Sequence, residues 1–330
     1  MLLSGANALQ KDSIIYVAGH RGLVGSAICR NLLQNGYERL LLRSHAELDL
    51  TDPAAVRRFF EQERPAYVFM AAAKVGGIMA NEVYPADFIR ENLLIETNVI
   101  DACYRSEVDR LLFLGSSCIY PKLCPQPIKE EYLLTGPLEP TNRPYALAKI
   151  AGVEMCWSYN RQFGTRYLAA MPSNLYGPGD NFDPQNSHVL PALIRKVAEA
   201  KALGHKQLVV WGTGTPRREL LFNEDLAEAC IFLMNLEEEV YAGLLAGVPL
   251  INIGTGKDVT IRELAEQVCF ALGFDGELVF DTTRPDGTPQ KLLDVTRIHN
   301  LGWKPKTTLA QGISLTYESA RPQLEALTTR

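Results

Sequence analysis

Two side chains that can move protons lie four positions apart in the segment Tyr145-Ala146-Leu147-Ala148-Lys149. On a helix, residues four apart share a face, so the phenol and the ammonium would lie side by side. A phenol with an ordinary pKa near 10 exchanges protons poorly at neutral pH, but a nearby cation stabilises its phenolate. Taken alone, such a pair is more often surface decoration. Ser116, which follows the apolar run Leu111 to Leu114, could bring a hydroxyl to the same site.

A glycine-rich turn, Gly19-His20-Arg21-Gly22-Leu23-Val24-Gly25, directly follows the apolar run Ile14 to Ala18. Glycines between a strand and a helix let backbone N–H groups approach a pyrophosphate at the positive end of the helix. Tight turns need glycine for steric reasons as well, so the spacing alone is a weak signal. Arg21 and Arg43 would place two guanidinium groups near an adenosine ribose, which suits the 2′-phosphate of NADP(H). For Arg43 alone, a solvated surface charge explains the residue equally well.

The elements that would position these groups alternate between β-rich runs and amphipathic helices. Strands are predicted at 14–18, 40–43, 67–70, 111–114 and 167–171, and helices at about 23–35, 53–63, 86–105 and 145–163. This alternation predicts a Rossmann-type, doubly wound parallel sheet of the α/β class. After Pro172 the sequence becomes loop-rich and predicts a smaller α/β cap over the carboxyl ends of the strands, where ligands bind.

Composition excludes several function classes. The 330 residues carry 33 Lys plus Arg against 38 Asp plus Glu, a net charge of −5 with no basic stripe, so nucleic acid is not an expected partner. The longest uncharged stretch, 240–256, is broken by Pro249 and is too short to span a membrane, and the first twelve residues do not resemble a signal peptide. A soluble, cytoplasmic protein is expected. The seven cysteines show neither a C-x-x-C pair nor zinc spacing, so no metal site is predicted.

Four longer segments carry a family resemblance: 71–78 (AAAKVGGI), 115–122 (GSSCIYPK), 140–145 (PTNRPY) and 174–178 (NLYGP). Together with the glycine turn and the Tyr145-x-x-x-Lys149 pair, they resemble the extended short-chain dehydrogenase/reductase family, which acts on nucleotide sugars. The resemblance runs from about residue 14 to about residue 317. Within that family, the four segments most resemble the bifunctional 3,5-epimerases and NADPH-dependent 4-reductases that convert GDP-4-keto-6-deoxy-D-mannose to GDP-L-fucose.

The resemblance implies roles for five catalytic residues, namely Tyr145, Lys149, Ser116, Cys118 and His188. Epimerisation on both sides of a ketone needs a base that removes each α-proton and an acid that returns one on the opposite face. Cys118 and His188 occupy the matching positions, since a thiolate can act as the base and an imidazolium as the acid. Without the family match, Cys118 would be taken as a buried structural thiol and His188 as a loop histidine.

The resemblance also implies binding residues and partners. Cofactor contacts with NADP(H) are expected from Gly19, Arg21, Gly22, Leu23, Val24, Gly25, Arg43, Asp49, Leu50, Ala72, Leu114, Lys149, Pro172, Asn174, Leu175 and His188, and contacts with the GDP-sugar substrate from Asn174, Lys196, Trp211, Arg218 and Asp286. The dinucleotide-binding domain is expected to comprise 13–176 and 219–254, and the substrate-binding domain 177–218 and 255–330. The helices at 86–105 and 145–163 resemble the pair with which this family forms a homodimer.

One departure from the family and two alternatives accompany this interpretation. Family members often carry a second arginine near the 2′-phosphate two positions beyond Arg43, where this chain has His45. A UDP-sugar 4-epimerase or a 4,6-dehydratase would share the glycine turn and the Tyr–Lys pair, although no carboxylate lies between Ser116 and Tyr120 as a dehydratase would need. A non-catalytic NADP-sensing protein often loses the Tyr or the Lys, and this chain retains both.

Overall fold

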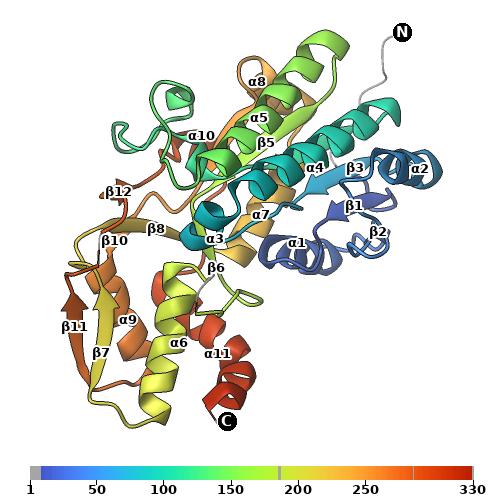
Figure 1. Ribbon diagram of the computed structural model, residues 1–330. Coiled ribbons are helices and arrows are strands. Elements are labelled where there is room, and N and C mark those ends of the chain that lie inside the picture. The colour runs from blue at the N-terminus through green and yellow to red at the C-terminus, as the bar shows by residue number, and fades with distance from the viewer. Residues whose placement is uncertain (1–8, 185–186, 285, 329–330) are drawn as a thin grey trace.

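The computed structural model describes residues 9–184, 187–284 and 286–328. Its centre is a six-stranded, all-parallel sheet (Figure 1) whose strands lie in the order β2-β1-β3-β4-β5-β9. The strands are β1 (Ile15–Ala18), β2 (Leu40–Leu41), β3 (Tyr67–Met70), β4 (Arg110–Leu114), β5 (Tyr167–Pro172) and β9 (Leu250–Ile253). All but the short β2 are fully buried, which explains why they read as continuous apolar runs.

Helices cover both faces of this sheet. Helices α1 (Leu23–Gln34) and α7 (Asn223–Met234) pack together on one face, while α2 (Pro53–Glu63), α4 (Pro85–Arg105) and α5 (Arg143–Phe163) pack on the other (Figure 1). The start of α2 is fixed locally, because the Asp52 side chain accepts hydrogen bonds from the backbone of Ala54 and Ala55 and Pro53 stands at the first turn. The shorter elements α3 (Ile78–Val83), η1 (Ser117–Ile119), η2 (Glu130–Tyr132), α8 (Glu238–Leu245) and α10 (Thr296–Asn300) complete this lobe.

A second, smaller lobe has its own hydrophobic core, which includes Ile194, Val197, Leu264 and Ile313. Strand β8 (Arg217–Phe222) pairs with β6 (Asn174–Tyr176), β10 (Asp258–Thr260) and β12 (Gln290–Lys291), and β7 (Gln207–Trp211) pairs with β11 (Glu277–Asp281). Helices α6 (Val189–Ala202), α9 (Ile261–Leu272) and α11 (Leu309–Thr328) pack against one another, below β8 and beside β7 and β11 (Figure 1).

The predicted fold class is confirmed, with the first five strands of the sheet in the predicted places. One detail differs from expectation: strand β2 covers only Leu40 and Leu41, so Arg43 lies in the loop beyond it. The uncharged stretch 240–256 holds most of α8 and the sixth sheet strand, β9. Across the described ranges, no helix combines the length and the apolar character that a membrane crossing requires. Nor do three His, Cys, Asp or Glu side chains of these ranges come together as a metal site would require.

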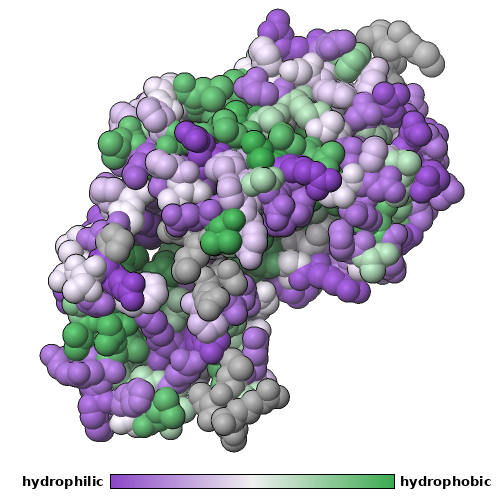
Figure 2. Space-filling view, viewed as in Figure 1, coloured by the Kyte–Doolittle hydropathy of each residue, from purple (hydrophilic) through white to green (hydrophobic). Residues whose placement is uncertain are grey.

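The surface view shows mainly hydrophilic side chains over both lobes (Figure 2). Hydrophobic side chains gather in the upper part of that view, over α4 and α5. Leu147 on α5 is 43% exposed and Tyr104 on α4 is 37% exposed. This exposed face is the one on which the sequence predicts contact with a second copy of the chain.

Candidate active site

The strand order reverses between β1 and β3, so the loops that leave their carboxyl ends diverge and open a crevice. The glycine turn lies at this point. Gly19 has φ +82°, and a Cβ on it would lie 2.7 Å from the backbone nitrogen of Ala72, in the loop after β3. A Cβ on Gly25 would collide with the carbonyl of Gly19. Only glycine therefore allows the turn, the start of α1 and the next loop to approach so closely.

A cavity of about 620 Å³ opens from this crevice, within the size range of small-molecule sites. All five predicted catalytic residues line it, as do all predicted cofactor residues except Arg21. They are Gly19, Gly22, Leu23, Val24, Gly25, Arg43, Asp49, Leu50, Ala72, Leu114, Ser116, Cys118, Tyr145, Lys149, Pro172, Asn174, Leu175 and His188. The first turn of α1 contributes backbone N–H groups at its positive end. The crevice, the glycine turn and the helix N-terminus fit a dinucleotide cofactor.

Ser116, Cys118 and Tyr145 meet at the end of β4. Ser116 caps the short helix η1, and its Oγ accepts a hydrogen bond of 3.3 Å from the backbone N–H of Cys118. Tyr145 lies in the first turn of α5 and is hydrogen-bonded to the Ser116 side chain. Burial raises the pKa of Tyr145 well above its ordinary value, the nearby Cys118 and Glu96 raise it further, and Ser116 opposes the rise. The phenol therefore holds its proton at neutral pH.

Lys149 is almost fully buried one turn further along α5. Its Nζ lies 5.9 Å from the centre of the Tyr145 ring and donates a 3.0 Å hydrogen bond to the carbonyl of Leu114. An ion pair of 3.1 Å joins it to Glu96 of α4, which is equally buried. Burial raises the pKa of Glu96, and the charge of Lys149 opposes the rise. Because the Glu96 carboxylate balances the ammonium, Lys149 stabilises the phenolate of Tyr145 less strongly than the four-residue spacing predicts. No sequence pattern pointed to Glu96.

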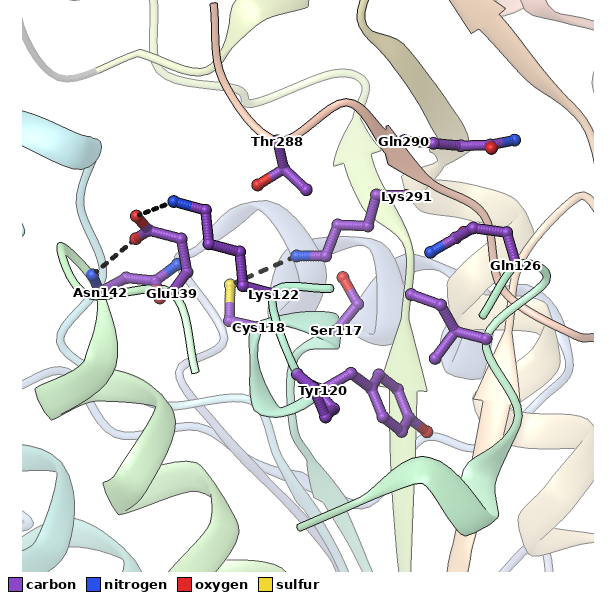
Figure 3. Close-up of a pocket in the computed structure, with 12 residues that line it drawn as sticks. Ser117, Cys118, Tyr120, Lys122, Gln126, Glu139, Asn142, Thr288, Gln290 and Lys291 are labelled. Atoms are coloured by element: carbon purple, nitrogen blue, oxygen red, sulfur yellow. Dashed lines mark hydrogen bonds and ion pairs between the residues drawn. The ribbon is translucent and has the colours of Figure 1, made fainter. Parts of the chain in front are cut away.

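The thiol of Cys118 faces a lysine that sequence analysis did not single out. Lys291 of β12 reaches to 3.7 Å from the Cys118 Sγ (Figure 3). His188, the N-cap residue of α6, lines the large cavity with its ring in contact with solvent. Desolvation by the surrounding protein lowers the pKa of His188, and the charge of Lys291 lowers this pKa further. A thiol and an imidazole from distant segments therefore line the large cavity, and the Lys291 ammonium contacts the thiol.

The two arginines predicted at the adenosine ribose differ in their surroundings. Arg43 lines the cavity, but its guanidinium forms a 2.6 Å ion pair with Glu63 and lies over the Phe59 ring. Arg21 is exposed and does not line the cavity. His45 does line it, and its Nδ1 lies 3.9 Å from an Asp49 carboxylate oxygen.

Four of the predicted substrate residues belong to the smaller lobe and do not line the large cavity. The Lys196 Nζ lies 4.9 Å from the centre of the exposed Trp211 ring. Asp286 accepts hydrogen bonds of 2.9 and 2.7 Å from the backbone and hydroxyl of Thr213, close to Trp211. Arg218 donates a 2.6 Å hydrogen bond to the carbonyl of Thr288. Asn174 alone among the predicted substrate residues lines the large cavity.

A parallel α/β sheet with a ligand crevice at its switch point defines a Rossmann-type nucleotide-binding protein. Residues 15–248 match the model of the family described as "NAD dependent epimerase/dehydratase family". The chain belongs to this family, which confirms the resemblance to the extended short-chain dehydrogenases/reductases.

Individual relatives are similar over nearly the whole chain. GDP-L-fucose synthase 1 of Arabidopsis thaliana is 58% identical over 93% of this chain and 93% of its own length. GDP-L-fucose synthase of Escherichia coli is 55% identical over 92% of this chain and 95% of its own length. Among solved structures, a GDP-L-fucose synthetase from Naegleria fowleri bound to NADP superimposes with a TM-score of 0.88 at 28% identity, covering 98% of this chain and 97% of that one. A GDP-mannoheptose C4 reductase from Campylobacter jejuni with NADP bound has a TM-score of 0.86 at 41% identity, covering 95% and 99%.

Proposed function

We propose that this chain is a bifunctional enzyme, a 3,5-epimerase and NADPH-dependent 4-reductase that converts GDP-4-keto-6-deoxy-D-mannose to GDP-L-fucose. The observation that carries the proposal is the placement of Cys118 and His188 in the same cavity as Ser116, Tyr145 and Lys149. A simple ketone reductase needs only the last three. The two relatives named GDP-L-fucose synthases, which are 58% and 55% identical to this chain, support the same substrate.

In the epimerase half, Cys118 removes the proton from the carbon beside the ketone and His188 returns a proton to the opposite face. The C4 ketone is what acidifies these C–H bonds, so epimerisation precedes reduction. Ser116 donates a hydrogen bond to the ketone oxygen and stabilises the negative charge that develops there. After reduction the ketone is gone, which ends the exchange and fixes the configuration of the product.

In the reductive half, NADPH when bound supplies the hydride that adds to C4. Tyr145 gives its proton to the C4 oxygen, and its raised pKa keeps that proton in place until the oxygen becomes basic. Lys149 would hold the nicotinamide ribose, and its ammonium, paired with Glu96, lies 5.9 Å from the centre of the Tyr145 ring. Arg43 and the exposed Arg21 serve the 2′-phosphate, and the ion pair of Arg43 with Glu63 orients its guanidinium.

The larger assembly follows from the same proposal. Residues 13–176 with 219–254 bind the dinucleotide, and 177–218 with 255–330 bind the GDP-sugar. Lys196 and Arg218 hold the diphosphate, Trp211 offers its exposed face, and Asp286 contacts sugar hydroxyls. Two chains pair through α4 and α5 into a homodimer, and a cytoplasmic location stays a prediction from the sequence.

The test is to incubate the purified chain with GDP-4-keto-6-deoxy-D-mannose and NADPH in heavy water and to follow the absorbance of the reduced cofactor. We expect one NADPH oxidised per product and deuterium at C3 and C5 of the sugar. Cys118→Ser should abolish formation of the epimerised product and leave NADPH binding intact. Oxidation of NADPH without deuterium in the product would show a plain C4 reductase and contradict the epimerase half.

A further inference from the structure

We infer that Lys291 is a positioning residue for the epimerase step, whose ammonium pairs with the thiolate of Cys118 and keeps it available as a base. The two residues are 173 positions apart in the chain, and their Nζ and Sγ atoms lie 3.7 Å apart (Figure 3). Within the described ranges, no carboxylate forms an ion pair with Lys291. Its charge is therefore free to compensate a thiolate, and cations beside a cysteine are what make the thiolate form accessible.

The direction from which Lys291 approaches separates this role from substrate binding. Cys118 lines two cavities, the large one described above and a small one of about 50 Å³. Lys291 lines only the small cavity, together with Thr288 and Gln290 (Figure 3). The small cavity has room for water but not for a sugar. Lys291 thus reaches the sulfur from the small cavity and is not among the residues that line the large one.

The backbone around Lys291 is held in place on every side. Gln290 donates a 2.7 Å hydrogen bond to Asp258, while the N–H groups of Leu292 and Leu293 donate to Gln126 and Glu219 at 2.8 Å each. Gln126 belongs to the loop that follows Cys118, so the hydrogen bond from Leu292 connects the segment that carries the ammonium to the segment that carries the thiol. A residue that positions or stabilises a catalytic group must itself be held in place, and these hydrogen bonds hold Lys291 beside Cys118.

Other charged and titratable groups near the thiol do not take this role. Those that border the thiol or the small cavity are Tyr145 on α5, His188 before α6, and Tyr120, Lys122 and Glu139 in the loops that precede α5. The Cys124 thiol also lies near Lys291: burial raises its pKa, and the charge of Lys291 opposes the rise. The ammonium of Lys122 forms a 3.7 Å ion pair with Glu139 and is already compensated (Figure 3). The charge of Lys291 also lowers the pKa of His188. One ammonium therefore acts on both groups that are proposed to move protons.

The experiment measures the rate at which iodoacetamide alkylates Cys118 in the full chain, with the modified peptide quantified by mass spectrometry. In Lys291→Met the rate at pH 7 should fall about tenfold or more, the usual effect of removing one cation within 4–6 Å. The pH profile of the reaction should move to higher pH. Lys291→Arg should restore most of the rate. Lys122→Met, which removes the compensated lysine of the same small cavity, should leave the rate unchanged.

The five buried cysteines, Cys29, Cys103, Cys156, Cys230 and Cys269, report on folding in the same sample, because they react only if the chain opens. Should Lys291→Met expose them, Lys291→Gln provides the same loss of charge. A Cys118 rate that is equal in wild type and the neutral variants would overturn the inference, and a rise in KM for the GDP-sugar with unchanged alkylation would assign Lys291 to the substrate. The inference rests on the proposed function only for the role of Cys118. If alkylation changes as expected but the chain turns over no GDP-sugar, the proposed function fails and the pairing stands.

Discussion

The charge balance around Tyr145 depends on a single carboxylate. Glu96 and Lys149 are each 1% exposed and form a 3.1 Å ion pair between α4 and α5. The carboxylate neutralises the ammonium and also raises the pKa of Tyr145. Both effects keep the phenol protonated, which suits a residue that must donate a proton to a reduced carbonyl. Helix packing and proton chemistry thus rely on the same pair.

Replacing Glu96 with Gln should therefore cost stability. The change leaves the buried ammonium of Lys149 without a counter-charge, and breaking a buried pair in this way lowers the free energy of unfolding by roughly 3–5 kcal/mol. Urea denaturation of the purified variant measures the loss. Glu91→Gln on the same helix is the matched control, because Glu91 pairs with Lys74 at 2.7 Å with about a third of each side chain exposed. Such a pair contributes about 0–1 kcal/mol. If both variants lose the same free energy of unfolding, burial does not make the Glu96–Lys149 pair more important than the exposed pair.

Local motifs predicted the glycine turn, Ser116 and the Tyr145–Lys149 pair, the family resemblance added Cys118 and His188, and neither pointed to Glu96 or Lys291. The glycine turn, Ser116 and the Tyr145–Lys149 pair lie at strand ends and helix starts, where parallel topology brings them together. Glu96 lies in the middle of a helix whose pattern explains it as an ordinary polar residue. Lys291 lies in a two-residue strand, and its distance from Cys118 is set by tertiary contacts such as the hydrogen bond of Leu292 to Gln126. No local spacing encodes such a contact.

At the scale of elements, α5 is held close to β4 by one glycine. A Cβ added to Gly152 would collide with the ring of Phe113 on β4. The same ring lies 4.7 Å from the Lys149 Nζ, so the spacing between this helix and strand also sets the position of the ammonium. The fit of α5 on the sheet therefore connects core packing to the site.

Gly152→Ala should lower the free energy of unfolding by about 1–3 kcal/mol, the usual cost of overpacking a core. It should also reduce NADPH-dependent turnover, since α5 carries Tyr145 and Lys149. Thermal denaturation and the cofactor assay measure the two effects. Gly243→Ala in α8 is the control: it is exposed, nothing lies within 4 Å of its added Cβ, and it should gain about 0.5–1 kcal/mol. A Gly152→Ala variant as stable as wild type would show that Phe113 moves freely.

Hydrophobic periodicity predicted the central sheet well because its buried strands and amphipathic helices alternate regularly. It did not predict how the smaller lobe is joined to it. Strand β8 begins in that lobe, and the Oε1 of its buried Glu219 accepts hydrogen bonds of 2.6 and 2.7 Å from the backbone of Thr255 and Gly256, which follow β9 of the central sheet. A carboxylate that satisfies backbone groups from separate segments produces no repeat or motif in the sequence.

At the scale of the whole molecule, the exposed face of α4 and α5 is the surface on which the proposed homodimer would form. Each helix has 21 residues, a length of about 30 Å. Midway along them, the Oγ1 of the exposed Thr97 lies 3.9 Å from the Sδ of the half-buried Met155. A two-fold axis through this point would pack the pair against its own copy as a four-helix contact, with the same surface used by both chains. The hydrophobic side chains over these helices in Figure 2 would then leave solvent.

Met155→Arg should convert the dimer to a monomer, because a two-fold contact would bury two unpaired guanidinium groups against each other. Sedimentation velocity of wild type and variant at the same concentrations measures the mass of each species, and circular dichroism confirms that both are folded. Val240→Arg is the control, since Val240 is 43% exposed and belongs to α8, which is not one of the two helices of the proposed contact, and its replacement should leave the dimer intact. A wild-type chain that sediments as a monomer, or a Met155→Arg chain that still sediments as a dimer, would rule out this face as the interface.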